Sequence, residues 1–171
     1  MKTELLIGCG ESREKKMSLK ADEGKWNNLT TLDFYPESGA DVLHDLEVFP
    51  YPFEDNSFDE IHAYEVLEHT GQQGDWRFFF DQFAELYRIL KPGGYLLGTV
   101  PAWNSLWAWA DPSHKRVLSH GSFVFLSQDQ YIQQVGKTPM TDFRHYWKGD
   151  FVPVYQHMAG EHFQFVLQAK K

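Results

Sequence analysis

Apolar positions along the chain fall into short runs separated by turn residues, a pattern typical of an α/β protein. Each run is short enough for a strand and ends at glycine, proline or small polar residues. The predicted strands are Thr3–Ile7, Leu29–Asp33, Asp41–Leu46, Phe58–Tyr64, Tyr95–Val100, Phe151–Met158 and His162–Ala169. The last two are joined so tightly, at Ala159-Gly160, that they must pair antiparallel.

One helix is predicted between the fourth and fifth strands, where apolar residues recur at steps of three and four. They are Phe79, Phe80, Phe83, Leu86, Tyr87 and Leu90. Asp75 is suited to cap its N-terminus, and Pro92-Gly93 ends it. The resulting βαβ unit predicts parallel strands with a right-handed crossover. Residues 11–28 show only weak helical periodicity, so we expect a shortened first crossover.

Composition favours a single domain spanning residues 1–171, since 42% of the 171 residues are hydrophobic and can form a substantial core. No apolar run reaches the roughly 18–20 residues of a membrane span. The first residues lack the apolar stretch of a secretory signal, and a single cysteine suits a reducing compartment, so we expect a cytoplasmic location. A formal charge of −8 argues against extended nucleic-acid binding. The short basic run of Arg13, Lys15, Lys16 and Lys20 is most simply a solvated surface.

Glycines and carboxylates follow the predicted strands at the edge where parallel sheets bind ligands. The first strand is followed by Gly8-Cys9-Gly10, the second and third close on Asp33 and Asp45, and the fourth ends at Tyr64 and Glu65. Glycine permits close approach of a ligand to the backbone, and a carboxylate can accept ribose hydroxyl protons. Arg13 stands where a dinucleotide fingerprint needs its third glycine, and no triphosphate-binding loop is present. The turn therefore favours a nucleoside without phosphates, preferably cationic.

Several stretches resemble the class I S-adenosylmethionine (SAM)-dependent methyltransferases, and most closely the short members of the methyltransferase-11-like group. They are "LLIGCG" (5–10), "WNNLTTLDFYP" (26–36), the segment 40–69, "ELYRILKPGGYLLGTVP" (85–101) and "DPSHKRVLSHGSF" (111–123). The resemblance implies a Rossmann-like, mostly parallel seven-stranded sheet with an antiparallel C-terminal hairpin, and SAM as cofactor.

The resemblance also implies roles for individual residues. Gly8, Cys9 and Gly10 would pass under the methionine part of SAM, and Tyr64 and Glu65 would line the methyl end. Asp33 would hold the ribose. Phe34 would pack on the adenine, and Asp45 and the backbone of Leu46 would contact the adenine edge. Leu6 and Ser12 depart from the family's first motif, which usually has an acidic residue and a glycine there.

The acceptor side is expected in the segment after the fifth strand. His114 could remove a proton from the acceptor and Arg116 could hold its carboxylate or phosphate. A loop held by salt bridges is an equal alternative. Trp103, Trp107 and Trp109 could form an aromatic wall or fill the core. We expect a small-molecule acceptor, while the oligomeric state stays open.

Other functions remain as alternatives. The departures at Leu6 and Ser12 fit a catalytically degenerate SAM-binding module, and a nicotinamide oxidoreductase is disfavoured by the missing third glycine. Glu65, Glu68, His69 and His114 resemble the metal ligands of small-RNA 3′-terminal 2′-O-methyltransferases. Because such a segment is also ordinary in metal-free relatives, we predict no metal site.

Overall fold

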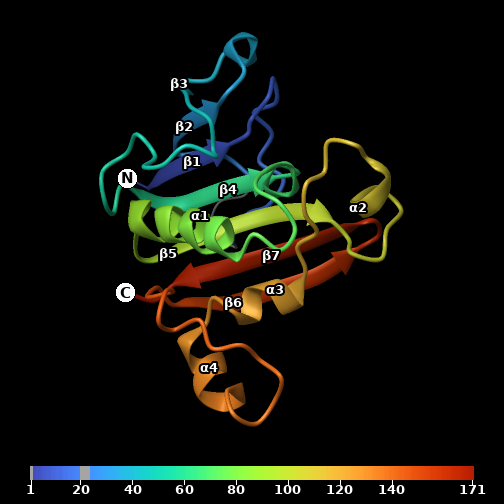
Figure 1. Ribbon diagram of the computed structural model, residues 1–171. Coiled ribbons are helices and arrows are strands. Elements are labelled where there is room, and N and C mark those ends of the chain that lie inside the picture. The colour runs from blue at the N-terminus through green and yellow to red at the C-terminus, as the bar shows by residue number, and fades with distance from the viewer. Residues whose placement is uncertain (1, 20–23) are drawn as a thin grey trace.

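The computed structural model describes residues 2–19 and 24–171, and its centre is one mixed sheet (Figure 1). In these residues seven strands pair in the order β3-β2-β1-β4-β5-β7-β6. Their bounds are β1 Thr3–Ile7, β2 Asn28–Asp33, β3 Val42–Leu43, β4 Phe58–Tyr64, β5 Leu90–Pro101, β6 Phe151–Ala159 and β7 His162–Ala169. The first five strands are parallel, and β7 runs antiparallel to both β5 and β6. The predicted Rossmann-like fold with an antiparallel C-terminal hairpin is confirmed.

The main helix lies on the face of the sheet that also carries α3 (Figure 1). The helices are α1 Trp76–Ile89, α2 Trp107–Ala110, α3 His120–Val124 and α4 Gln128–Gln134, with 3₁₀ turns η1 Pro36–Ser38 and η2 Leu67–His69. Asp75 caps α1 as predicted, because its side chain accepts the backbone N–H of Phe78 at 3.1 Å. The predicted apolar face of α1 is buried, with Phe83 against Phe123 of α3.

Two strand predictions differ from the structure by more than one residue at an end. The predicted strand 41–46 pairs only at Val42–Leu43, because the N–H of His44 donates to the carbonyl of Asp33 and the chain then turns at Asp45. The fifth strand begins at Leu90 instead of Tyr95, since Leu90 already pairs with Phe58. An irregular segment with Gly93 at φ +76° separates this pair from the regular pairing that starts at Tyr95. The carboxyl ends of β1, β2 and β4 are as predicted, whereas Asp45 and Leu46 lie in the turn beyond β3.

The second face of the sheet is polar at its centre. Side chains alternate across a strand, so β1 places Glu4, and β4 places Glu60 and His62, on the face opposite α1. All three are buried. Glu60 Oε2 lies 3.0 Å from His62 Nε2, and Lys15 Nζ lies 2.6 Å from Glu4 Oε1. An apolar crossover helix would leave these groups without partners.

An irregular β1–β2 connection covers this polar face instead. The described residues of the connection contain no helix, in agreement with the predicted shortened crossover. The indole of Trp26 packs edge-on against His62, and its Nε1 donates to the carbonyl of Arg13 at 2.6 Å. The prediction of a solvated basic surface is wrong for Lys15, whose side chain is fully buried, while Lys20 lies outside the described residues. Within residues 2–19 and 24–171, no helix is long and apolar enough to cross a membrane.

Candidate active site

A cavity of about 730 Å³ opens at the carboxyl ends of β1, β2 and β4. Seven of the predicted cofactor residues line it: Gly8, Gly10, Asp33, Phe34, Asp45, Leu46 and Glu65. They come from four separate segments of the sequence, which only the parallel sheet brings together. The cavity is large enough for a ligand of nucleoside size.

The turn after β1 forms the floor of this cavity and depends on its glycines. Gly8 has φ +59°, and a Cβ at this position would collide with the side chain of Val66 from the turn after β4. Gly10 has φ +50°, and a Cβ there would meet open space. Gly8 therefore lets the two turns pack closely, whereas Gly10 leaves room beside the backbone.

Asp33 connects the turn after β1 to the end of β2. Its Oδ2 accepts the backbone N–H of Gly10 at 2.8 Å, and its Oδ1 accepts that of Tyr35 at 2.9 Å. Each carboxylate oxygen keeps a further lone pair for a ligand hydroxyl. The same side chain can thus hold the turn in shape and bind a diol.

Apolar and acidic groups occupy the next part of the lining. Phe34 is 72% exposed and Leu46 is buried, so the cavity offers one exposed ring and one covered aliphatic surface. Asp45 is exposed, and its Oδ1 accepts the N–H of Glu47 at 2.9 Å. This arrangement suits a planar heterocycle with an exocyclic amine.

Cys9 and Tyr64, two predicted cofactor residues, lie away from the cavity. Cys9 packs in a small buried cluster with Leu6 and Tyr64, and burial raises the pKa of its thiol, which opposes a reactive role. The Tyr64 hydroxyl lies 2.6 Å from His62 Nδ1 and accepts the N–H of Met17 at 3.1 Å on the second face of the sheet. Strand alternation explains why Tyr64 follows His62 to that face.

Glu65 reaches the cavity because the chain turns sharply after β4. Its backbone has φ +51°, an uncommon conformation for a residue with a side chain. Its N–H donates to the carbonyl of Thr99 at 2.8 Å, and its Oε1 lies 3.2 Å from His162 Nδ1. These contacts fix Glu65 at the rim between β4 and β5.

Nine further residues line the cavity and were not predicted as cofactor contacts. They are Tyr35, His44, Glu47, Val66, His69, Thr70, Pro112, Ser113 and Lys115. Lys115 Nζ lies 2.7 Å from Glu47 Oε1, which also accepts the N–H of Gly71 at 2.7 Å. Burial alone would raise the pKa of Glu47, but these hydrogen bonds outweigh it and hold the pKa below its ordinary value. Lys115 stands between His114 and Arg116 in the sequence, so the segment predicted for the acceptor side already contained it.

Arg116 does not line this cavity and is buried between η2 and α1, beside a separate pocket of about 240 Å³. Its Nε donates to the carbonyl of Leu67 at 3.0 Å, and its Nη2 donates to Thr70 Oγ1 at 3.0 Å and to Gln82 Oε1. Burial lowers the pKa of Arg116 to about 10. These contacts give the side chain a structural task in place of the predicted contact with an acceptor.

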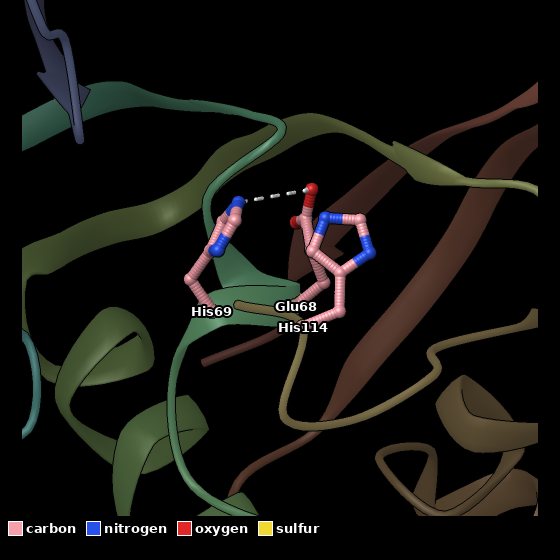
Figure 2. Close-up of side chains that lie close together, drawn as sticks. All are labelled: Glu68, His69 and His114. Atoms are coloured by element: carbon pink, nitrogen blue, oxygen red, sulfur yellow. Dashed lines mark ion pairs between the residues drawn. The ribbon is translucent and has the colours of Figure 1, made fainter. Parts of the chain in front are cut away.

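His114 also lies outside the cavity lining, where its ring packs against His69 and beside Glu68 (Figure 2). The two ring centroids are 4.7 Å apart. Glu68 is 2% exposed, and burial raises the pKa of its carboxyl to about 8. Of these three residues only His69 reaches the cavity.

The three tryptophans of segment 103–109 do not fill the core. Trp103, Trp107 and Trp109 are 48%, 55% and 68% exposed, so the core-filling alternative is wrong. None of the three lines the cavity, and the aromatic wall stays a prediction.

Comparisons with known proteins place this chain in a family. The model of the methyltransferase domain family matches residues 5–98, more than half of the chain. A SAM-dependent methyltransferase from Archaeoglobus fulgidus is similar in structure, with a TM-score of 0.60, 13% identity, and 98% of this chain and 86% of that chain covered. A search among curated proteins found no match.

Two further solved structures share the fold at low identity. The complex of the Haloferax volcanii Trm112 methyltransferase activator and a putative methyltransferase matches with a TM-score of 0.61 and 15% identity, covering 99% of this chain and 83% of that chain. The N-methyltransferase NodS from Bradyrhizobium japonicum, in complex with S-adenosylhomocysteine (SAH), matches with a TM-score of 0.56 and 14% identity. The match covers 99% of this chain and 79% of that chain.

The chain belongs to the methyltransferase domain family. The fold and the family predicted from the sequence, and with the family the methyltransferase class of enzyme, are thereby confirmed.

Proposed function

We propose that the cavity at the carboxyl ends of β1, β2 and β4 holds SAM, and that the methyl group of SAM is transferred to a small-molecule acceptor. The observation that carries this proposal is the convergence of seven predicted cofactor residues on one cavity of about 730 Å³. In the reaction, a lone pair of the acceptor attacks the methyl carbon in line with the breaking carbon–sulfur bond, and SAH leaves. Alignment of the two reactants supplies most of the rate.

The positions of the lining residues support one orientation of the cofactor. Asp33, with a spare lone pair on each oxygen, would accept the ribose hydroxyls, and Phe34, Asp45 and Leu46 would surround the adenine. Gly8, Gly10 and Glu65 would then lie along the methionine part. Under this assignment Cys9 and Tyr64 support the turn from behind.

The charge of the lining supports a small acceptor over a nucleic acid. Among the described lining residues, Asp33, Asp45, Glu47 and Glu65 are acidic, and Lys115 is the only lysine or arginine and pairs with Glu47. An acidic lining attracts a sulfonium cofactor and repels a phosphate backbone. The formal charge of −8 acts in the same direction.

Calorimetry with SAH tests the proposal, with Asp33→Ala as the decisive variant. Loss of a charge-assisted hydrogen bond should weaken SAH binding by roughly 1.5–3 kcal/mol, about 10- to 150-fold. Asp41→Ala is a matched control, because Asp41 also accepts backbone and hydroxyl hydrogen bonds, both from Thr31 at 2.8 Å, but lies outside the cavity lining. Equal SAH affinity of the two variants, or binding of NADH in place of SAH, would contradict the assignment.

A further inference from the structure

We propose that Glu68, His69 and His114 form a binding site for a divalent transition-metal cation of the Zn²⁺ type, next to the cavity. One ligand atom from each of the three side chains lies within 4.8 Å of the other two. Glu68 and His69 belong to η2 after β4, whereas His114 comes from the loop after α2, so the group joins two distant segments. Figure 2 shows the Glu68 carboxyl group between the two imidazole rings.

The carboxyl group of Glu68 accepts no hydrogen bond, and its one ion-pair contact, with His69 Nε2, is long at 3.9 Å. Its side chain is 3% exposed, and neither Oε1 nor Oε2 has a hydrogen-bond partner in the described structure. His114 Nδ1 is likewise buried without a partner. Buried polar atoms are almost always hydrogen-bonded, so the two unpaired oxygens of the Glu68 carboxyl group indicate a missing ligand. The nitrogen of His114 nearer to this carboxyl group is Nε2, which lies 3.8 Å from Asp111 Oδ2 (Figure 2).

His69 is held with a free lone pair directed at this cluster. Its Nδ1 lies 3.2 Å from the carbonyl oxygen of Ser113, which can only accept, so Nδ1 carries the proton. Nε2 is then the unprotonated nitrogen, and it lies 3.9 Å from Glu68 Oε1. A hydrogen bond that fixes one nitrogen of a histidine while the other binds a metal is the usual arrangement around metal-ligating imidazoles.

The donor set selects the class of cation. Two imidazoles and one carboxylate suit Zn²⁺ and related first-row divalent ions, whereas Mg²⁺ and Ca²⁺ prefer oxygen ligands alone. Ligands about 2.1 Å from one ion lie roughly 3–3.5 Å apart, so the group must contract on binding. The side chain of His69 is 38% exposed and has room for this movement.

A second group of suitable side chains, Glu4, Glu60 and His62, has the same spacing but a different environment. Lys15 Nζ lies 2.6 Å from Glu4 Oε1, and Lys2 Nζ lies 2.6 Å from Glu60 Oε1. Ammonium groups already neutralise these carboxylates, and a cation would have to displace them. Of these two groups in the described part of the chain, only the one around Glu68 combines the ligand spacing with a carboxyl group that accepts no hydrogen bond on either oxygen.

The position of the proposed site gives it access to the reaction. His69 lines the cavity, while Glu68 and His114 lie behind it. A cation with three protein ligands keeps a position for a water or an acceptor oxygen. That role rests on the proposed function, whereas cation binding itself rests only on these three side chains.

Titration of the chelator-treated full chain with Zn²⁺ tests the site, and the visible absorption of bound Co²⁺ reports the coordination. We expect one Zn²⁺ per chain, and affinity at least about 100-fold lower in Glu68→Gln and in His114→Asn, which each remove a ligand. His69→Gln, at a partly exposed position, gives the same test if a buried variant fails to fold. His157→Gln removes an exposed histidine elsewhere and should leave the affinity unchanged.

SAH affinity, measured on the same samples, separates this inference from the proposed function. Glu68 and His114 do not line the cavity, so their variants should still bind SAH. Retained SAH binding with unchanged Zn²⁺ affinity in all three ligand variants, or no Zn²⁺ binding by the wild type, would overturn the metal site alone. Zn²⁺ binding without SAH binding would overturn the proposed function and leave the metal site standing.

Discussion

Arg116 Nη2 donates a hydrogen bond to Thr70 Oγ1 at 3.0 Å, and both residues are buried. This contact joins the loop after α2 to the turn after β4, on which His69 and Thr70 line the cavity. The guanidinium thus supports the wall of the cavity from behind.

Replacement of Arg116 should therefore lower stability more than it alters the cavity lining. Arg116→Met removes the donor to Leu67, Thr70 and Gln82, and each buried acceptor left unpaired costs about 1–3 kcal/mol. We expect a loss of at least about 2 kcal/mol in the free energy of unfolding, measured by urea denaturation. Arg144→Met, which breaks an exposed ion pair with Asp142, should leave the free energy of unfolding nearly unchanged. Equal losses in the two variants would argue against the structural role.

Gly8 should tolerate a side chain poorly, because it combines a positive φ with close packing against Val66. In Gly8→Ala the new methyl group meets Val66 in addition to the strain of φ +59°. Gly136→Ala is the matched control, with φ +78° and no heavy atom within 4 Å of the added Cβ. We expect the control to lose about 1–2 kcal/mol in the free energy of unfolding, and Gly8→Ala to lose about 1–3 kcal/mol more. A smaller loss in Gly8→Ala than in Gly136→Ala would show that the two turns do not need their close contact.

The part of the site that the sequence predicted is the part set by local pattern. Strand ends can be read from period-two alternation and turn residues, and parallel strands bring their carboxyl ends together. Asp33, Asp45, Gly8 and Gly10 were predicted in this way, and all four line the cavity. Asp33 ends β2, Gly8 directly follows β1 and Asp45 lies two residues beyond β3, so the order of the strands along the chain already indicates where these residues lie.

Two predicted cofactor residues, Cys9 and Tyr64, do not line the cavity. In both cases the side of the backbone on which the side chain lies changes from one residue to the next. Tyr64 and Glu65 are neighbours, but alternation sends Tyr64 to the second face while φ +51° turns Glu65 to the cavity. Gly8 and Gly10 line the cavity, but the side chain of Cys9 between them packs into the buried cluster with Leu6 and Tyr64. Arg116 lies outside the cavity lining because the loop after β5 is shaped by contacts with η2 and α1, which no local pattern reveals.

The polar second face of the sheet gives a prediction about Lys15. Its fully buried ammonium group lies 2.6 Å from Glu4 Oε1, and Asn27 donates its N–H to Glu4 Oε2 at 2.7 Å. Removing one partner of a buried ion pair lowers the free energy of unfolding by about 3–5 kcal/mol. We expect a loss near the lower end for Lys15→Met, because Lys2 Nζ lies 3.5 Å from Glu4 Oε1 and still compensates part of its charge.

A double-mutant cycle distinguishes the ion pair from simple packing of the lysine. Glu4→Gln combined with Lys15→Met removes both charges, so the double variant should be more stable than Lys15→Met by at least about 1 kcal/mol. Urea denaturation of the four proteins gives the coupling energy. Additive losses would mean that Lys15 contributes through its aliphatic stem alone.

Glu68 should make the stability of the metal-free protein depend on pH. Burial raises the pKa of its carboxyl from 4.5 to about 8, so between these values the folded chain holds a proton that the unfolded chain has released. The stabilisation is therefore complete below about pH 4.5 and is lost as the pH rises toward about 8. The free energy of unfolding should fall by up to about 1.4 kcal/mol per pH unit in this window.

Glu68→Gln removes the titrating group while keeping the shape of the side chain, and should lack this decline. Urea denaturation of both proteins with a chelator present, at about pH 5.5 and about pH 7.5, should show the wild type losing stability relative to the variant. Glu14→Gln, at an exposed position, controls for the loss of one negative charge and should follow the wild type. If the wild type and Glu68→Gln declined in parallel, the Glu68 carboxyl would be ionised in the folded protein throughout this range, and a partner other than a proton would have to hold it.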